Sequence, residues 1–276
     1  MAAENPRATT TSAGRDTRMF AGSVVRRVPE TLASGITTAN LGSPDPNDAR
    51  DQHARYVEAL QSCGLEVTTL EEDARYPDSV FVEDTAVVTD RCAVVTNPGA
   101  ENRRGEVPAV EALLTDLYGG VECIVEPGTL DGGDVLQVGD HFYVGLTRRT
   151  NVAGAQQMAG ILAGYGFGVS TVELREFLHL KTGVAYLGGR DLVVTGELVE
   201  HPAFDGFDKI IVPPEEAYAA NCIRVNDRVL VAAGYGRTLG EISARGYEVV
   251  ELEVGEFRKL DGGLSCLSLR LPGGRP

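Results

Sequence analysis

Apolar and polar positions follow a repeating pattern along the chain. Four segments each contain an apolar run, a short polar turn and a second apolar run: TAVVTDRCAVVT, DVLQVGDHFYVG, GVAYLGGRDLVVTG and CIRVNDRVLVAAG. Their turns fall at Asp90, Gly139, Gly189 and Asn226, and Asp, Gly and Asn are residues that tight hairpin turns favour. The pattern therefore predicts four β-hairpins.

A helix and a third strand are predicted after most of these hairpins. Helical patterns occupy residues 103–120, 151–166 and 237–247, and apolar runs typical of strands follow at 121–127, 168–174 and 248–253. The third hairpin is followed quickly by KIIVPP, with no convincing helix between them. A further helix and strand are predicted near the start of the chain, at residues 46–64 and 65–71.

The two ends of the chain complete the pattern. The run GGLSCLSLRL at residues 262–271 and the run MFAGSVVRRV at residues 19–28 supply the two strands of a fifth hairpin. When chain termini share one unit, a ring of repeats closes. We therefore predict an α/β fold, a five-unit ββαβ propeller with pseudo-fivefold symmetry, forming a single closed domain over residues 19–276. Residues 1–18 are predicted to be a disordered tail.

Composition narrows the function classes. The net charge of −15 disfavours binding to nucleic acid, because the phosphates would be repelled. No apolar run approaches the length that spans a membrane. The five cysteines form no Cys-x-x-Cys pair, so neither a zinc finger nor a disulfide framework is indicated. We expect a cytoplasmic protein that binds neither nucleic acid nor membrane and needs no cofactor or metal.

Polar residues cluster just before the first strand of several hairpins. If the repeats superpose, these residues converge at one end of the central axis, where a nucleophile, a base and carboxylates could share one pocket. The members are Asp78, Glu83 and Asp84 in PDSVFVEDTAVV, Asp131 and Asp134 in GTLDGGDVL, His179 in FLHLKTG, and Asp261 and Cys266 in DGGLSC.

Each of these residues also has a purely structural interpretation. Free cysteine is often buried, so Cys266 could be a small core residue, and His179 could be a core histidine with satisfied hydrogen bonds. The three carboxylates in PDSVFVEDTAVV are harder to explain in this way, because burying an unpaired charge is costly. The histidines His53, His141 and His201 are predicted to lie at the surface, and the other four cysteines in the core.

Five ordered motifs resemble the dimethylarginine dimethylaminohydrolase family of guanidino-modifying enzymes. They are PDSVFVEDTAVV, NPGAENRRGE, GTLDGGDVLQVGDHFYVGLTRRTN, LHLKTGVAYL and KLDGGLSCLSLRL, and the similarity runs from about Met19 to Leu271. The resemblance implies a five-unit α/β propeller. It also implies hydrolysis of Nω-methylated L-arginines to L-citrulline and dimethylamine or methylamine, through a covalent cysteine thiouronium intermediate.

The resemblance also implies roles for individual residues. Cys266 would be the nucleophile, His179 the general acid and base, and Asp131 the acidic third member, where several relatives have Glu. The substrate-binding residues implied are Asp78, Glu83 and Asp84 for the guanidinium and α-amino ends, Arg103 and Arg149 for the carboxylate end, the Leu260 carbonyl for the α-amine, and Ile36 in a lid.

Two other functions remain open from the sequence. Arginine deiminase or amidinotransferase chemistry could use the same scaffold, although deiminases usually carry an added helical domain for which this length leaves no room. A non-catalytic binder of cationic amino acids would use the acidic pocket alone and leave Cys266 and His179 idle. The oligomeric state is expected to be a monomer or a homodimer.

The acidic surroundings lead to one expectation about Cys266 itself. Like charge disfavours a thiolate, and carboxylates are crowded toward the same pocket. We therefore expect a neutral thiol at pH 7, with a pKa at or above the usual value of about 8.5. A bound guanidinium would promote ionisation of the thiol.

Overall fold

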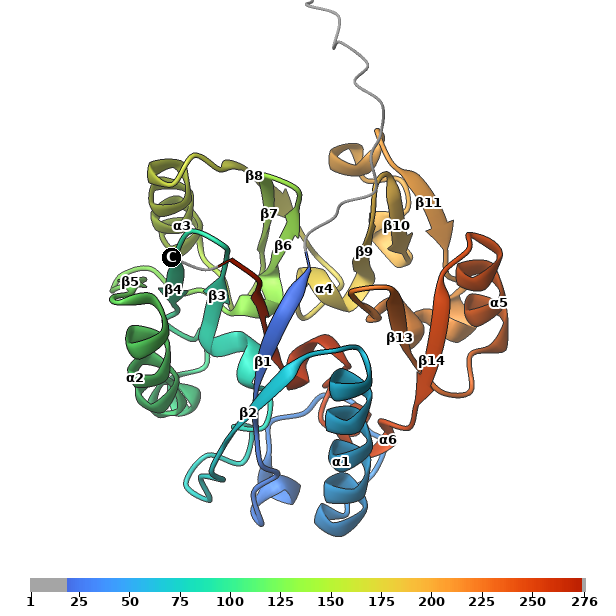
Figure 1. Cartoon of the computed structure of the whole chain (residues 1–276), viewed down its shortest axis with the longest axis horizontal. Helices are drawn as coiled ribbons and strands as arrows, with labels where there is room; N and C mark the ends of the chain where they lie inside the picture. Colours follow the sequence, from blue (N-terminus) through green and yellow to red (C-terminus); the bar gives the residue numbers. More distant parts are fainter. Residues whose placement is uncertain (1–18, 275–276) are drawn as a thin grey trace, which may run out of the picture.

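The structure of the protein is a computed structural model that describes residues 19–274. This part of the chain forms five three-stranded sheets, which surround a central axis with the long helices outside them (Figure 1). In each sheet the first two strands are antiparallel, and the third runs parallel to the second. The predicted ββαβ propeller is therefore confirmed, whereas the predicted tail at residues 1–18 lies outside the described residues.

The strands take equivalent positions in the five units. The first strands are β3 (Ala86–Val88), β6 (Val135–Val138), β9 (Val184–Gly188), β12 (Ile223–Val225) and β15 (Leu269–Pro272). The second strands are β4 (Ala93–Val95), β7 (His141–Leu146), β10 (Asp191–Val194), β13 (Arg228–Ala232) and β1 (Phe20–Arg26). The third strands are β5 (Glu122–Cys123), β8 (Gly168–Glu173), β11 (Asp208–Ile211), β14 (Glu248–Leu252) and β2 (Glu66–Leu70).

The hairpin turns lie at the residues predicted from the sequence. Gly139, Gly189 and Asn226 each begin a two-residue loop and have positive φ angles of 60°, 60° and 55°. Two-residue hairpin loops need this left-handed conformation, which glycine and asparagine adopt at low cost. The turn at Asp90 is longer and joins β3 to β4.

Four units place an α-helix between the second and third strands. These helices are α2 (Val107–Tyr118), α3 (Val152–Gly164), α5 (Gly236–Ala244) and α1 (Pro46–Ser62). The first turn of α1 is capped by Asp45, whose side chain accepts hydrogen bonds from Asn47 N and Asp48 N, a favoured way to satisfy free backbone donors. The unit built on β9 has only 3-10 turns here, η5 (Gly196–Leu198) and η6 (Pro202–Phe204), as the sequence predicted.

Short helices connect the units and carry several of the polar residues. The remaining short elements are α4 (Leu180–Gly183), α6 (Gly255–Arg258), η1 (Leu32–Ser34), η2 (Val82–Thr85), η3 (Glu101–Glu106), η4 (Gly132–Asp134), η7 (Pro214–Ala220) and η8 (Ser265–Leu267).

The ring closes between the two ends of the chain. β1 pairs with β15 in antiparallel register, with Val24 opposite Leu269. The side chain of Asn226 accepts a hydrogen bond from Phe20 N at 2.8 Å and donates one to Phe20 O at 3.1 Å. These contacts join the fifth unit to the fourth, so the sheet edge at the start of β1 is tied to its neighbour.

Two local predictions were wrong. The helix predicted at residues 103–120 begins as the 3-10 segment η3, and its α-helical part starts only at Val107. Pro108 explains the boundary, because proline fits the first turn of an α-helix but disrupts its interior. The strand predicted at residues 262–271 is confined to β15, and Cys266 lies before it on η8.

Three burial predictions were also wrong. His53 is buried on the inner face of α1, beside Tyr56 and Phe257, and burial lowers the pKa of its imidazole to about 4. Cys63 is half-buried and Cys123 is exposed, whereas Cys92 and Cys222 are buried as expected. A periodic pattern does not reveal which polar residue of a helix faces a neighbouring unit.

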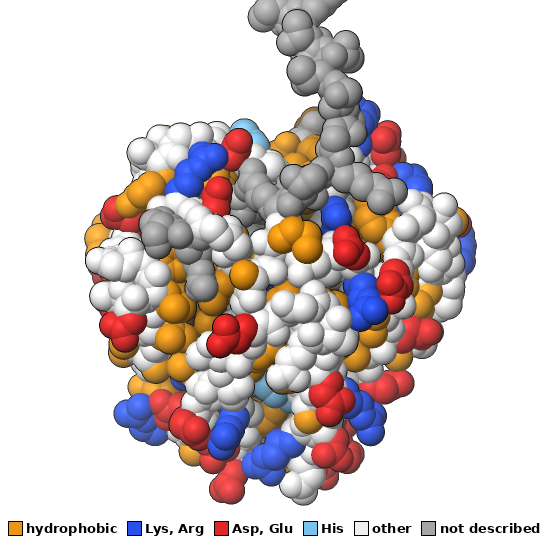
Figure 2. Space-filling view, in the orientation of Figure 1, with side chains coloured by type: hydrophobic (Ala, Val, Ile, Leu, Met, Phe, Trp, Pro, Cys, Tyr) orange, Lys and Arg blue, Asp and Glu red, His pale blue; other side chains and the backbone are white. Residues whose placement is uncertain are grey.

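The surface agrees with the acidic composition. Acidic and basic side chains are interspersed over the lower part of the face shown in Figure 2.

Within residues 19–274, no helix combines the length and apolar character needed to cross a membrane.

Candidate active site

Four connecting segments meet at one end of the propeller axis. η2 contacts both η4 and η8, and η4 contacts α4. These segments carry or adjoin Asp84, Asp131, His179 and Cys266. The convergence predicted from superposed repeats is therefore present.

The convergent side chains surround a small cavity of about 30 Å³. Its lining residues are Ile36, Asp78, Phe81, Asp84, Arg103, Arg149, Leu178, His179, Leu260, Asp261, Gly262 and Cys266. This set includes every predicted site residue except Glu83 and Asp131. Small-molecule sites usually enclose several hundred Å³, so binding an arginine derivative here would require the cavity walls to move.

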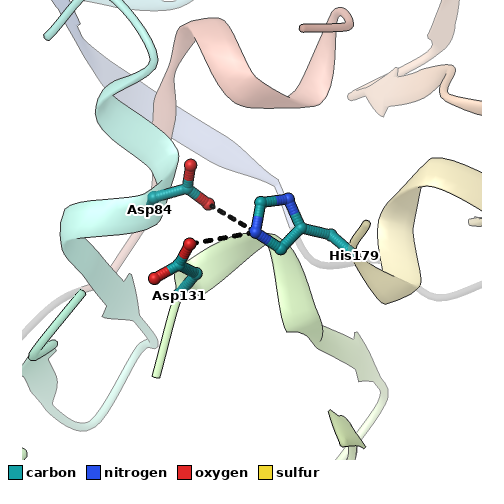
Figure 3. Close-up of side chains that lie close together, drawn as sticks. All are labelled: Asp84, Asp131 and His179. Atoms are coloured by element: carbon teal, nitrogen blue, oxygen red, sulfur yellow. Dashed lines mark hydrogen bonds and ion pairs between the residues drawn. The ribbon is translucent and has the colours of Figure 1, made fainter. Parts of the chain in front are cut away.

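One ring nitrogen of His179 faces two buried carboxylates, those of Asp84 and Asp131 (Figure 3). Its Nε2 atom is 3.0 Å from Asp131 Oδ2 and 4.0 Å from Asp84 Oδ1. Burial alone would lower the pKa of His179, but Asp84, Asp134 and Asp131 outweigh it and raise the pKa to about 9. The imidazole is therefore protonated at neutral pH and can act as a proton donor.

Arginines complete the charge pairing of this group. Arg103 Nη1 lies 2.6 Å from Asp84 Oδ2, and Arg149 Nη1 lies 3.5 Å from Asp131 Oδ2. Burial would raise the pKa of Asp84, but His179 and Arg103 hold it below its usual value. Both carboxylates therefore have cationic partners before any ligand binds.

The Asp-Gly-Gly sequence after Asp131 explains how His179 comes so close. A Cβ atom at Gly133 would lie 3.0 Å from both Cγ and Nδ1 of the His179 ring. A Cβ atom at Gly132 would collide with the carbonyl oxygen of Glu83. The two glycines thus let η4 pack directly against η2 and the imidazole, as close backbone approach requires.

Cys266 lies on η8 with its side chain buried at the cavity wall. Its Sγ atom accepts a hydrogen bond from Gly263 N at 3.5 Å. Burial, together with the negative charges of Glu83 and Asp84, raises the pKa of the thiol to about 12. This agrees with the expectation of a neutral thiol in the free protein.

Glu83 occupies a different position from the other predicted carboxylates. It is bound by Lys181 Nζ at 2.6 Å, Ser265 Oγ at 2.7 Å and Arg270 Nη2 at 3.0 Å. It lines a second cavity, of about 190 Å³, rather than the small one. Its carboxylate already has three donors, so it supports η8 through Ser265.

Arg103 is likewise held by protein groups. Besides Asp84, it binds Glu106 at 2.8 Å and the carbonyl oxygen of Phe81 at 3.0 Å. The side chain reaches the cavity wall, but its donors are already engaged. Arg149 is less constrained and is better placed to meet a ligand carboxylate.

Ile36 lines the cavity, and its segment is bonded to two carboxylates that line it as well. Ile36 N donates a hydrogen bond to Asp78 Oδ1 at 3.0 Å, and Thr38 N donates one to Asp261 Oδ2 at 2.6 Å. The Thr38 hydroxyl also donates to Asp261 Oδ2, at 3.1 Å. Two carboxylates therefore fasten residues 36–38, which we call the lid segment, to the site.

Asp261 is a site residue to which sequence reasoning gave no role. It belonged to the polar cluster of the fifth unit, but nothing in the sequence showed that it would meet the lid segment. Its φ angle is +58°, a conformation that Asp tolerates better than most residues. Phe81, Leu178 and Gly262 also line the cavity, and no sequence signal separated them from core residues.

Asp84, Asp131 and His179 are close enough to surround a cation. Their candidate ligand atoms lie within 4.8 Å of one another. However, Arg103 and Arg149 already pair with the carboxylates, and a protonated His179 has no free nitrogen lone pair with which to coordinate a metal ion. The charge arrangement fits a proton-transfer site better than a resident metal.

Comparison with known proteins decides the family. A family model for eukaryotic N,N dimethylarginine dimethylhydrolase matches residues 43–202. The chain is 49% identical over 253 residues to the N(G),N(G)-dimethylarginine dimethylaminohydrolase of Pseudomonas aeruginosa, covering 91% of this chain and 100% of that protein. This chain belongs to the dimethylarginine dimethylaminohydrolase family.

Other members and their structures support the assignment. The Streptomyces coelicolor dimethylarginine dimethylaminohydrolase is 39% identical over 249 residues, covering 90% of this chain and 96% of that protein. A citrulline complex of a cysteine-to-serine mutant of the Pseudomonas aeruginosa protein superposes with a TM-score of 0.91, covering 92% of this chain and 100% of that one, at 49% identity.

A more distant structure shares the fold alone. The N-terminal domain of ArgZ, an arginine dihydrolase of cyanobacteria, matches with a TM-score of 0.79 at 20% identity, covering 90% of this chain and 97% of that one. This likeness shows a common fold and carries no assignment of activity.

We expect the Cys266 thiol to react slowly with a neutral alkylating reagent until the pH is strongly basic. The thiolate is the reactive form, and its fraction stays small until the pH approaches the thiol pKa of about 12. A bound guanidinium should lower the apparent pKa, because it places positive charge near sulfur. The measurement is the alkylation rate from pH 6 to 10, with and without a slowly reacting cationic ligand. An apparent pKa near 6 without ligand would contradict this expectation.

We expect Asp261→Gly to raise KM several-fold while changing kcat little. Glycine keeps the positive φ angle of Asp261 without strain but removes the acceptor of the lid hydrogen bonds. Asp261→Asn, which retains one oxygen acceptor, is the matched control and should stay close to wild type. Steady-state kinetics of the three proteins are the measurement, and an unchanged KM in the glycine variant would show that the lid does not depend on Asp261.

Proposed function

We propose that the protein hydrolyses Nω-methylated L-arginines, both dimethyl and monomethyl, to L-citrulline and dimethylamine or methylamine. The observation that carries the proposal is a closed cavity in which Cys266 and His179 lie among carboxylates suited to a guanidinium. The names of the Pseudomonas and Streptomyces relatives support the same substrate class. A structure of the family bound to citrulline supports the product.

Substrate binding would use the charges around the cavity. Asp78 and Asp84 would hold the cationic parts of the ligand through charge-assisted hydrogen bonds, which are shorter and stronger than neutral ones. Burial raises the pKa of the Asp78 carboxyl, so a cationic partner would favour its ionised form. Arg149 would bind the carboxylate end, and the Leu260 carbonyl would accept from the α-amine.

The first chemical step would form a bond between Cys266 sulfur and the guanidinium carbon. A guanidinium carbon is a weak electrophile, so a thiolate is the side-chain nucleophile best suited to it. The carbon–nitrogen bond to the methylated nitrogen then breaks, and His179 gives that nitrogen a proton as it leaves. The thiol proton passes to solvent as substrate binds. The amine leaves as a neutral molecule with the proton from His179, so His179 ends the step neutral.

The second step would hydrolyse the thiouronium. His179, now neutral, takes a proton from water, and the resulting hydroxide attacks the same carbon. The carbon–sulfur bond breaks, and the hydroxyl proton of the intermediate passes to the departing sulfur as the citrulline carbonyl forms. This releases citrulline and restores the Cys266 thiol, with His179 protonated again. The high pKa of His179 suits the first step, in which it must begin as an acid.

The test is to identify the amine released from a panel of substrates. The protein would be incubated with arginine, monomethylarginine, dimethylarginine, and arginine plus glycine. We expect dimethylamine or methylamine with citrulline, and poor turnover of alkylguanidines that lack a carboxylate. Fastest release of ammonia from unmodified arginine would identify a deiminase instead, and transfer to glycine would identify an amidinotransferase.

We further propose a cytoplasmic location, a single domain from residue 19 to 276, and a monomeric or homodimeric state. All five cysteines are free, which is typical of proteins in a reducing compartment. Size-exclusion chromatography with light scattering would measure the oligomeric state.

A further inference from the structure

Asp134 is a buried carboxylate that does not line the active-site cavity. It lies at the end of η4, and its side chain is fully buried. None of the ion pairs within residues 19–274 joins it to an arginine or lysine. Three neutral donors bind it instead: Thr150 Oγ1 at 2.6 Å, Thr147 Oγ1 at 2.8 Å and Leu180 N at 2.9 Å.

Two of these donors lead directly to residues of the candidate site. Thr147 Oγ1 accepts a hydrogen bond from Arg149 N at 3.0 Å. Thr150 Oγ1 accepts one from Asp131 N at 3.2 Å. Each threonine hydroxyl thus accepts from a site residue's backbone and donates to Asp134 Oδ2.

The third donor fixes the segment that carries His179. Leu180 N, which donates to Asp134 Oδ1, belongs to the residue directly after His179 and begins α4. Asp134 therefore reaches Arg149 and Asp131 through one threonine each, and His179 through the adjacent peptide.

We propose that Asp134 is a positioning residue that sets Arg149, Asp131 and His179 relative to one another for catalysis. The proposal rests on the proposed function in taking these three as site residues. Asp134 would not touch the substrate. Asp131 already joins the side chains of His179 and Arg149, and the carboxylate of Asp134 would hold the backbone of the same three segments from behind the cavity.

The chemistry of the contacts requires a carboxylate. All three partners are donors, and an ionised carboxylate offers only acceptors. An amide keeps only one acceptor oxygen, so its NH₂ group would face either the two threonine hydroxyls or Leu180 N and leave those donors without an acceptor. Burying a carboxylate without a paired cation is also costly, and burial raises the pKa of Asp134 to about 6. If this position only supported the fold, a neutral residue would do so at a lower desolvation cost. The carboxylate therefore indicates a role in the site.

The test compares Asp134→Asn with a matched carboxylate far from the site. Asp191, on β10, is a partly buried carboxylate that accepts from Arg245 and Tyr247, so Asp191→Asn makes the same chemical change at a hydrogen-bonded carboxylate outside the site. Both variants would be assayed well below their unfolding midpoints, with whichever guanidine compound the wild type turns over. We expect Asp134→Asn to lose about 100-fold in kcat/KM, with lower kcat and higher KM, because small misplacements of catalytic groups are costly. Asp191→Asn should stay within about threefold of wild type.

An Asp134→Asn variant that folds and keeps kcat/KM within about threefold of wild type would overturn the proposal. If that variant fails to fold, Thr147→Val and Thr150→Val replace it, with the corresponding serine variants as controls. The valine variants should lose at least about 10-fold in kcat/KM and the serine variants should retain it, because serine keeps the hydroxyl. Equal activity of the valine and serine variants would overturn the proposal.

A failure of the proposed substrate would be recognised separately. If the wild type turns over no guanidine compound, the readout becomes the imidazole titration of His179, measured by NMR. His179 faces Asp84, Asp131 and Asp134, with Arg103 and Arg149 paired to the first two. We then expect Asp134→Asn to lower the pKa of His179 and Asp191→Asn to leave it unchanged. No difference between the two variants would overturn the proposal.

Discussion

Replacing Cys266 with serine is expected to reduce kcat for methylated arginine by a factor of about 10⁴ or more, as removal of a nucleophile does in other covalent enzymes. A serine hydroxyl is much less acidic than a thiol and a far weaker nucleophile toward a guanidinium carbon. Ligand binding should change little, because Asp78, Asp84 and Arg149 remain in place. Amine release and calorimetric binding of dimethylarginine are the two measurements.

Cys222→Ser is the matched control for this substitution. Cys222 is also buried and free, and it occupies the equivalent region of the fourth unit, but it does not line the small cavity. We expect the control to keep near-normal activity. Equal amine release by Cys266→Ser and wild type would contradict a nucleophilic role for Cys266, and ligand binding without amine release by either protein would favour the non-catalytic binder.

Replacing His179 with glutamine is expected to reduce kcat for methylarginine by about 10²–10⁴-fold, the usual contribution of general acid–base catalysis. Glutamine can donate a hydrogen bond to Asp131 but cannot transfer a proton. Departure of the amine and activation of water would both become slow. The half-buried His141, which binds Ser170, provides the control His141→Gln, for which we expect no loss.

The pH dependence of kcat/KM, which reports the pKa values of the free enzyme, separates this role from a structural one. The pKa of His179 is raised to about 9, so the acid form is present at neutral pH and is lost as pH rises through that value. The wild type should show this basic limb, and His179→Gln should lack it. An unchanged profile in the variant would show that another group supplies the proton.

Much of the fold could be predicted from the sequence because the repeat signals are local. Hairpin turns at Gly139, Gly189 and Asn226 need left-handed residues, and those residues are visible in the sequence. The absence of a helix in the third unit could be predicted as well, because the sequence between its hairpin and the next strand shows no helical pattern. The strand predicted around Cys266 failed because close packing between units, rather than local propensity, sets the turn of η8.

The candidate site could be predicted only as a set of residues that converge. Repeats that superpose bring Asp84, His179 and Cys266 together whatever their side-chain directions. The ion-pair and hydrogen-bond partners of each side chain depend on those directions. The sequence therefore could not show that Lys181 and Arg270 bind Glu83. It also could not show that Asp134 receives the threonine hydroxyls, since those contacts arise between segments that only the folded chain brings together.

The central claim is covalent catalysis at Cys266, and a trapped adduct tests it most directly. S-methyl-L-thiocitrulline, found as an adduct with a histidine-to-glycine variant of a family member, releases methanethiol without needing a strong acid. With His179→Gln, sulfur exchange should proceed, and hydrolysis should be slow because no base activates water. Peptide mass spectrometry should then find the compound minus methanethiol on the peptide that contains Cys266. Turnover without an adduct on Cys266, or an adduct on a different cysteine, would contradict the account.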